Sequence, residues 1–248
     1  MELSEYFAQT PGAAIAFSGG VDSAYLLYAA QQYGARVRAY YVKSAFQPQF
    51  ELDDALKLAG QLSADMKIIE ADVLASEIIT ANPPDRCYYC KKIIFETIAK
   101  AAREDGFSVL LDGTNASDEE GDRPGMRALR ELSVQSPLRI CGLTKDEIRN
   151  RSREAGLFTW DKPAYACLAT RIPAGETITA KKLAATEEAE NYLFALGFTD
   201  FRVRMMGDIA RLQFTEDQIG RAVEKREDIL RELKKYYTAV LLDLQVRE

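Results

Sequence analysis

Six residues at positions 18–23, SGGVDS, separate two short apolar runs. A strand, a glycine turn and a helix start in this order form a backbone cradle for an anion. Gly19 and Gly20 allow successive N–H groups to turn toward one centre, and a helix N-terminus adds partial positive charge. The hydroxyl groups of Ser18 and Ser23 can donate to a phosphate. The stretch therefore predicts a phosphate site.

Asp22 is an unusual residue beside an anion. It fits there if it caps the helix or holds a divalent cation that bridges to phosphate. The stretch has no Gly-Lys-Ser/Thr ending, so it is not a Walker A loop, and it is not a G-x-G-x-x-G fingerprint. It resembles the pyrophosphate loop of the N-type ATP pyrophosphatases. This resemblance implies that ATP and Mg²⁺ bind here and that AMP is transferred to a substrate oxygen.

The cysteines form a second group with possible chemistry. Cys87 and Cys90 open a predicted helix as a C-x-x-C pair beside basic residues, which favours thiolate. Cys167 lies on a loop in the same half of the fold. Three thiolates suit a [4Fe–4S] cluster with one open iron, and four, with Cys141, suit a zinc site. The pair can also be a redox disulfide or buried thiols. Cys141 lies in an expected short buried strand, 138–142, and is interpreted as structural.

Composition narrows these choices. The chain has 248 residues, 47% of them apolar, and a net charge of −6, which argues against broad nucleic-acid or membrane binding. It has no histidine, so histidine bases, histidine metal ligands and Ser-His-Asp triads are excluded. No run approaches the ~18 apolar residues of a membrane span. We expect no signal peptide, a cytoplasmic location and reduced thiols.

The first two-thirds of the chain alternates strand-like and helix-like segments. This alternation predicts an α/β fold, a parallel sheet with helices on both faces. Ligands of such sheets lie beyond the carboxyl ends of the strands, so Ser18, Val42, Gly113 and Thr114 should converge on one crevice as ATP-binding residues. The expected strands are 13–17, 37–42, 67–69 and 109–111, and the expected helices include 52–62 and 91–102.

The pattern changes in the last third. Residues 113–136 predict a long active-site loop with one short helical turn, and Thr144 with Glu147 predicts a capping box. A further loop covers 160–175. Beyond it we expect a small α+β domain, so that the chain divides into 1–172 and 173–248. Its expected elements are a helix at 180–196, a hairpin of strands 201–206 and 209–214, a helix at 215–235 and a strand at 239–244.

Several motifs occur together in one order: SGGVDS, CYYCK, DGTN, RPGMRAL, KPAYACLATRIP and FRVRMMGDIARLQF. The chain resembles the LarE-type ATP-dependent sulfur transferases of nickel-pincer nucleotide biosynthesis over nearly its whole length. The resemblance implies an adenine nucleotide α-hydrolase-like fold and a small substrate or oligomerisation domain. It also implies that ATP adenylates a carboxylate of pyridinium-3,5-biscarboxylic acid mononucleotide and that sulfur then displaces AMP.

The resemblance also implies a sulfur route. Some members sacrifice one cysteine from the loop that matches residues 163–171, and others hold a [4Fe–4S] cluster on three cysteines. This chain has Cys87, Cys90 and Cys167, so it is similar to the second type. The sacrificial route stays open for Cys167. A small-molecule nucleotide substrate, a sulfide donor and a homo-oligomer are the expected partners.

Paired arginines predict where the substrate phosphate binds. Alternation along a strand puts Arg202 and Arg204 on one face, where two guanidinium groups can clamp a phosphate. The alternative is a solvated edge strand. The resemblance adds Glu190 and Arg247 as weaker partners of the phosphate. Arg171 faces the adenylate or the cluster, or else pairs with Asp161 or Glu176.

Other functions remain open on the same residues. A tRNA thiolation enzyme also combines this loop with a C-x-x-C pair, but the chain has neither extra C-x-x-C pairs nor a basic tail. Amide-forming members of the superfamily need no cysteine set. A nucleotide-binding regulatory module would not consume ATP.

Overall fold

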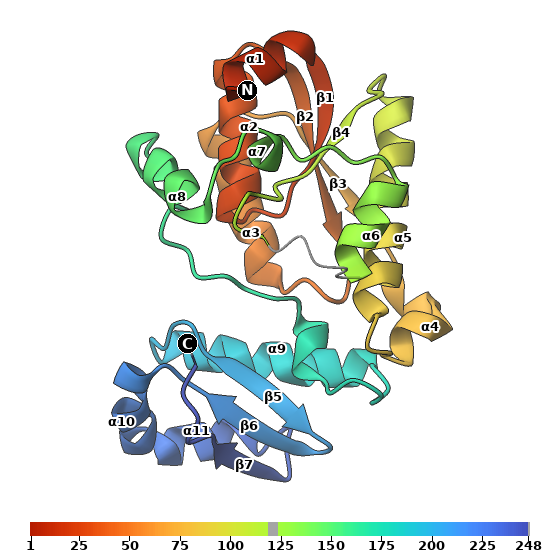
Figure 1. The fold of residues 1–248 in the computed structure, drawn as a ribbon. Helices are drawn as coiled ribbons and strands as arrows, with labels where there is room; N and C mark the ends of the chain where they lie inside the picture. The colour runs from red at the N-terminus through yellow and green to blue at the C-terminus, as the bar shows by residue number, and fades with distance from the viewer. Residues whose placement is uncertain (119–123, 248) are drawn as a thin grey trace. The chain divides into compact units, whose positions relative to one another are not determined.

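The computed structural model describes residues 1–118 and 124–247. The chain forms two compact units, each built from two segments (Figure 1). The first unit consists of Met1–Val73 and Asp85–Lys162, and the second of Leu74–Pro84 and Pro163–Glu248. No helix in the described residues is long and apolar enough to cross a membrane.

The first unit contains a four-stranded parallel sheet, as the sequence predicts. Its order is β3-β2-β1-β4, so the strand that precedes the glycine turn is central. All strand pairs are parallel, and all carboxyl ends therefore meet at one edge. The strands are β1 (Gly12–Ala16), β2 (Arg36–Lys43), β3 (Met66–Glu70) and β4 (Leu110–Leu111).

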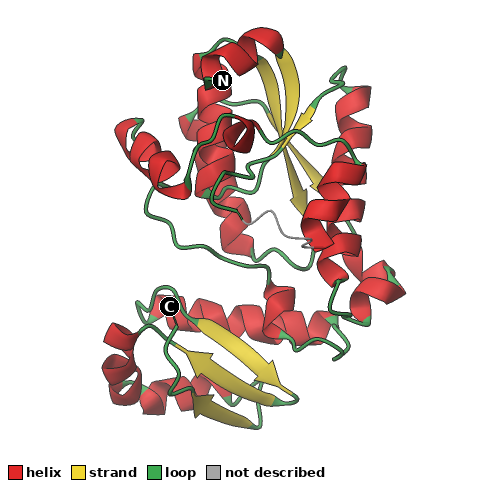
Figure 2. Ribbon diagram, viewed as in Figure 1, coloured by secondary structure: helices red, strands yellow, loops and turns green. Residues whose placement is uncertain are grey.

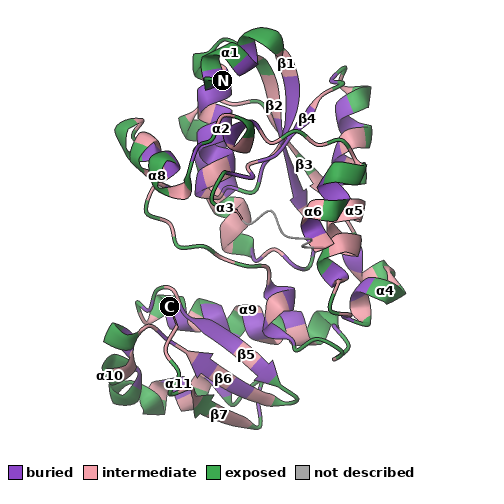
Figure 3. Ribbon diagram, viewed as in Figure 1, coloured by how far each residue is buried: buried purple, intermediate pink, exposed green. Residues whose placement is uncertain are grey.

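Helices cover both faces of this sheet, because successive side chains of a buried strand point to opposite sides. Ala13 and Ile15 of β1 belong to one apolar core, and Ala14 belongs to the other. The middle of β1 and the second half of β2 are buried, whereas β3 has no fully buried residue (Figure 3), and Figure 2 shows helices on either side of the strands. One face carries α1 (Leu3–Gln9), α2 (Val21–Gln32), α3 (Gln49–Gln61), α7 (Pro137–Ile140) and α8 (Lys145–Glu154), and the other carries α5 (Arg86–Glu104) and α6 (Pro124–Glu131).

The second unit is an α+β structure with a three-stranded mixed sheet of order β5-β6-β7. The expected hairpin is confirmed, with β5 antiparallel to β6, and β7 joins parallel to β6. The predicted single helix over 215–235 is wrong, because the chain leaves helical geometry at Lys225 and starts again at once. The elements are α9 (Ala180–Ala195), β5 (Arg202–Met206), β6 (Ile209–Gln213), α10 (Glu216–Glu224), α11 (Arg226–Leu233) and β7 (Ala239–Leu242).

Two local predictions in the first unit need correction. The expected strand over 138–142 is instead α7, because Pro137 occupies the first helical turn, where its missing N–H is harmless; Cys141 is the residue that ends the helix. The loop predicted for 113–136 contains an eight-residue helix, α6, rather than one short turn. Its residues 119–123, which include Arg123 of the RPGMRAL motif, lie outside the described residues.

Residues 74–84 belong to the second unit through Asn82. This buried residue has a φ of 55°, and its side chain donates to the carbonyls of Ile172 and Pro173 at 3.3 and 2.7 Å. Its own carbonyl accepts from Gly175 N at 2.8 Å. The segment contains η1 (Val73–Ala75) in part and α4 (Glu77–Thr80). The compact units thus divide the chain differently from 1–172 and 173–248, and that domain boundary stays a prediction.

Asp105 joins the end of α5 to the sheet. Its carboxylate accepts from Lys67 Nζ at 2.9 Å, from Tyr40 Oη at 2.8 Å and from Arg38 Nη1 at 3.0 Å. These donors come from β2 and β3. The hydrogen bond from Lys67, followed by that from Tyr40, lowers the pKa of Asp105 to about 2.

We predict that Asp105→Asn lowers the melting temperature of the protein by several degrees at neutral pH. A depressed folded-state pKa gives stability that is present above the unfolded pKa of about 3.9 and is lost as the pH falls toward the folded pKa. The difference between variant and wild type should therefore shrink between about pH 4 and pH 2. Asp161→Asn, at an exposed position, is the control. A difference that is constant with pH would contradict the role of the carboxylate charge.

Candidate functional site

The SGGVDS loop joins the central strand β1 to the start of α2. Gly19 has a φ of 72°, which glycine adopts without strain, and no side chain caps α2 at Gly20. The two serines hold the loop in shape: Ser18 N donates to Ser23 Oγ at 3.2 Å, and Ser23 Oγ donates to Gly20 O at 3.2 Å. The arrangement is that of an uncapped helix start with a curled loop, which suits an anion.

Two glycines are required by close contacts around this loop. A Cβ on Gly19 would lie 3.1 Å from Ala55 Cβ, and one on Gly113 would lie 2.8 Å from Ser23 N. The residues after β4 are thereby brought against the start of α2. Thr114 is buried and donates its hydroxyl to Asp112, which also accepts from Ser136 Oγ at 2.6 Å. The Thr114 side chain therefore holds the loop after β4 in place.

Asp22 does not cap its helix, so one of the two roles predicted for it is absent. Its carboxylate accepts from Asn115 Nδ2 at 3.2 Å and forms an ion pair with Lys145 Nζ. Lys145 is the first residue of α8, whose predicted capping box is confirmed. One carboxylate at a phosphate cradle suits a nucleotide-bound Mg²⁺, which takes one or two protein carboxylates and fills its other positions with phosphate and water.

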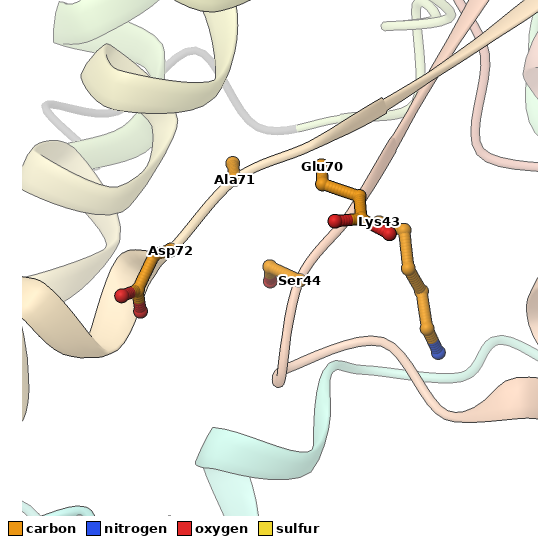
Figure 4. Close-up of a pocket in the computed structure, with 5 residues that line it drawn as sticks. All are labelled: Lys43, Ser44, Glu70, Ala71 and Asp72. Atoms are coloured by element: carbon orange, nitrogen blue, oxygen red, sulfur yellow. The ribbon is translucent and has the colours of Figure 1, made fainter.

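A cavity of about 410 Å³ lies at the carboxyl ends of β2 and β3. Figure 4 shows Ser44 between Asp72 and the neighbouring side chains of Lys43 and Glu70. Lys43 Nζ donates to Gln47 O at 2.6 Å, so the turn after β2 is fixed. Val42 is buried in the sheet, and it can meet a ligand only through its backbone.

The C-x-x-C pair lies in the first turns of α5, which starts at Arg86, as expected of a pair that opens a helix. Cys87 is exposed and Cys90 is partly buried. Arg86 Nη2 lies 3.8 Å from Cys87 Sγ and donates to it. The two thiols therefore share one side of the first helical turns, beside a guanidinium group.

Cys167 belongs to the second unit, whereas Cys87 and Cys90 belong to the first. Within the described parts of the chain, no three cysteine, aspartate or glutamate side chains form a ready-made metal site. The three-cysteine cluster stays a prediction.

The loop that carries Cys167 is built around Arg171, which is 1% exposed. Its guanidinium donates to Ala166 O at 2.9 Å, and Thr170 Oγ1 donates to Cys167 O at 2.8 Å. Arg171 pairs with Glu190, not with Asp161 or Glu176. Burial disfavours its charged form, but the hydrogen bonds to Glu190 raise its pKa above the ordinary value.

Glu190 is a buried anchor for this loop. Its carboxylate accepts from Arg171 Nε at 2.8 Å and Nη2 at 3.1 Å, from Val203 N at 3.0 Å and from Tyr165 Oη at 2.5 Å. The Tyr165 ring also lies under Arg171, 4.6 Å from its Cζ. With its oxygens used in this way, Glu190 orients Arg171 and β5, and its part in binding a phosphate stays a prediction.

The two arginines of β5 differ in their surroundings. Arg202 is buried and donates to Phe201 O at 2.6 Å and to Ala164 O at 2.5 Å. Burial, followed by repulsion from Arg171 and Arg247, lowers its pKa to about 10. Arg204 is partly buried and donates to Gln213 Oε1 at 2.7 Å and to Thr170 O at 3.4 Å. β5 is an edge strand, but Arg202 is buried and Arg204 is partly buried, so neither is the solvated side chain of the alternative interpretation.

Arg204 faces further positive charge. Arg211 lies directly opposite it in the β5–β6 register, and burial, followed by Arg171, Arg211 and Arg247, lowers the pKa of Arg204. Arg247 is held by Asp200 at 2.6 Å. Arg211 pairs with Asp243 at 3.4 Å, whereas Arg204 donates to neutral oxygens, so Arg204 is the arginine of this group whose surroundings suit an anion.

No family model matches the chain. It is 35% identical, over 233 residues, to the pyridinium-3,5-bisthiocarboxylic acid mononucleotide synthase of Lactiplantibacillus plantarum, and the match covers 93% of this chain and 84% of that protein. The chain belongs to the LarE-like family of PP-loop ATP pyrophosphatases. It is therefore an enzyme of that superfamily.

Two further relatives of this LarE-like enzyme differ in identity and in how much of the chain they match. An uncharacterized protein of Synechocystis sp. is 36% identical over 225 residues, which are 90% of this chain and 83% of that protein. A tRNA-specific 2-thiouridylase of Thermotoga petrophila is 24% identical over 190 residues, which are 60% of this chain and 53% of that protein. The similarity to the thiouridylase is thus weaker and covers less of both chains.

Sequence reasoning missed three contacts of the predicted residues: Lys145 with Asp22, Tyr165 with Glu190, and Arg211 opposite Arg204. Lys145 lies between Thr144 and Glu147 of the predicted capping box, and nothing in its local sequence indicates a contact with Asp22. A period-two pattern along β6 could have placed Arg211 on the face of the paired arginines.

We predict that Glu190→Gln destabilises the second unit by about 3–5 kcal/mol, because it leaves the Arg171 guanidinium buried without its partner. Hydrogen exchange across 163–172 and α9 should increase accordingly. Glu176→Gln breaks a partly exposed pair with Lys182 and should cost less than about 1 kcal/mol. An unchanged stability combined with weaker phosphate binding would instead favour a direct role of Glu190 at the substrate.

Proposed function

We propose that this LarE-like enzyme uses ATP to adenylate a carboxylate of pyridinium-3,5-biscarboxylic acid mononucleotide and then inserts sulfur in place of AMP. The observation that carries the proposal is the SGGVDS cradle at the start of α2, in a chain matched along 93% of its length by the bisthiocarboxylic acid mononucleotide synthase. The first step forms an acyl adenylate and releases pyrophosphate. In the second, sulfide attacks the carbonyl carbon and AMP leaves, which gives a thiocarboxylate.

The first unit supplies the residues for ATP. Backbone N–H groups of the loop and the hydroxyl of Ser18 are suited to the pyrophosphate, and Ser23 holds the loop in shape through Ser18 N and Gly20 O. Gly113 and Thr114 follow β4 beside this loop, and the cavity after β2 and β3 is available to the rest of the nucleotide. Mg²⁺ held by Asp22 would offset the negative charge of the leaving pyrophosphate.

The second unit supplies the residues for the substrate phosphate. Arg204 donates to two neutral oxygens, and its guanidinium is repelled by three other arginines, so an incoming dianion would relieve that repulsion. Arg202 uses two of its N–H groups on backbone carbonyls and contributes mainly charge. Arg247 is steered by Asp200 toward the same cluster.

The cysteines supply the sulfur. Cys87 and Cys90 suit a [4Fe–4S] cluster because they are thiols three residues apart in the first helical turns, next to a guanidinium group. Cys167 would be the third thiolate. Such a cluster, when bound, supplies an open iron that carries transferable sulfide. The alternative keeps the same adenylation step but takes the sulfur of Cys167 itself.

We predict that the enzyme releases pyrophosphate from ATP only when the dicarboxylate mononucleotide is present. Gly19→Ala should abolish this release, because the new Cβ would approach Ala55 in a backbone conformation that L-residues rarely adopt. Gly34→Ala, which also has a positive φ but has no atoms near the new Cβ, is the control for backbone strain. The assay measures pyrophosphate and, with sulfide added, the thiocarboxylate by mass spectrometry.

In the same assay Arg204→Gln should raise the half-saturating concentration of the mononucleotide by about tenfold or more, as expected for one lost charged hydrogen bond, and leave that of ATP unchanged. Arg226→Gln, at an exposed site of α11, is the matched control. Stimulation by tRNA rather than by the mononucleotide would favour thiouridylase-like chemistry and overturn the substrate.

We predict that protein purified without oxygen is brown and holds about four irons per chain, since three thiolates support one such cluster. Replacement of Cys87 or Cys90 by Ser should remove the iron, whereas Cys141→Ser should not. Stoichiometric zinc without iron would contradict the cluster. Turnover that removes the elements of hydrogen sulfide from Cys167, seen as a mass loss in the protein, would identify the sacrificial route instead.

A further inference from the structure

Asp22 holds two partners that come from distant parts of the first unit. One carboxylate oxygen accepts from Asn115 Nδ2 at 3.2 Å, and the other is bonded to Lys145 Nζ. Helices α2 and α8, which carry Asp22 and Lys145, pack side by side through the same apolar core (Figure 1). The ion pair therefore stands at the edge of the SGGVDS cradle.

The position of the lysine is set by its backbone. Thr144 caps α8, and Lys145 N donates to Ser117 Oγ at 2.9 Å. The first residue of α8 is thus fixed between the helix cap and the loop after β4. Only the aliphatic stem and the ammonium group of Lys145 remain free to change direction.

The charges at this place compete. Asp22 lies in the first turn of α2, where its negative charge repels the phosphate that the cradle attracts. Lys145 neutralises that charge through a carboxylate oxygen that a divalent cation needs. The two side chains are 35% and 24% exposed, for Lys145 and Asp22 respectively, so water and ions can reach the pair.

We propose that Asp22 exchanges Lys145 for the divalent cation that arrives with the nucleotide, and that the released ammonium group turns to the polyphosphate. This inference rests on the proposed use of ATP. No bond is broken in the exchange: the carboxylate trades one cation for another, and the ammonium group trades a carboxylate oxygen for a phosphate oxygen. Lys145 thereby makes nucleotide binding depend on the cation.

The exchange has a measurable signature. The ammonium group of Lys145 should contact the nucleotide only when Asp22 has another cation or has lost its charge. The dissociation constant of α,β-methylene ATP, which cannot be cleaved to AMP and pyrophosphate, can be measured by calorimetry in Mg²⁺ and in EDTA. The proteins to compare are the wild type, Asp22→Asn, Lys145→Met, the double variant, and Lys100→Met at an exposed position of α5 as control.

In Mg²⁺, Lys145→Met should weaken binding by about tenfold, the effect of roughly one charged hydrogen bond. Asp22→Asn should bind the analogue in EDTA about tenfold more tightly than the wild type does, because the ammonium group is already released. This gain should disappear in the double variant. Lys100→Met should match the wild type throughout.

A gain in EDTA that persists in the double variant would show that Asp22 acts only by repulsion, and it would overturn the exchange. A Lys145→Met variant that binds the analogue in Mg²⁺ as tightly as the wild type does would overturn it too. Either result leaves the proposed function intact, since the wild type still binds the nucleotide. A wild type that binds no analogue in either buffer would remove the proposed function together with this inference.

Discussion

The parallel arrangement of one small sheet is the constraint on which the first unit depends. Every strand ends at the same edge, and β1, whose residues Ala13, Ala14 and Ile15 are fully buried, is its centre. Small side chains on β1 let helices pack closely on both faces. The chain that follows β1 must therefore leave the sheet between the helices that cover its two faces. A loop of small residues is the solution that the chain uses, and it places backbone N–H groups at the edge where ligands bind.

The second unit has a different constraint, because several arginines lie close together in it. One buried carboxylate, Glu190, meets Arg171, Tyr165 and the backbone of β5. A single acid thus fixes the loop of Cys167 and the strand of Arg204 with respect to each other. The other guanidinium groups are left with neutral acceptors or shared acids, which keeps the local charge positive. Glu190 thus fixes the geometry of the loop and the strand, and the arginines keep a positive charge that suits an anion.

Signals within a few residues predicted most of the fold. The glycine turn after β1, the capping box at Thr144 and the hairpin at Gly207 each depend on local geometry, and each lies where the sequence indicated. The break at Lys225 has no glycine or proline to announce it. Contacts between distant residues, such as Asp22 with Lys145 and Asn82 with Pro173, leave no periodic trace in one sequence. They decide the roles of the site residues, and they had to be seen in the structure.

The two segments of the second unit are separated by 78 residues of the first, Asp85–Lys162. During synthesis, residues 74–84 emerge long before the chain that receives them. Asn82, buried in the finished protein, must wait in water until the carbonyls of Ile172 and Pro173 exist. Meanwhile the first unit can bury its strands and helices, and residues 74–84 remain a loop that leaves the unit and returns to it. The chain also passes between the two units three times, whereas two domains that follow one another along a chain are joined by a single linker. A discontinuous unit makes the second half of the protein the last to be completed and ties its completion to that of the first.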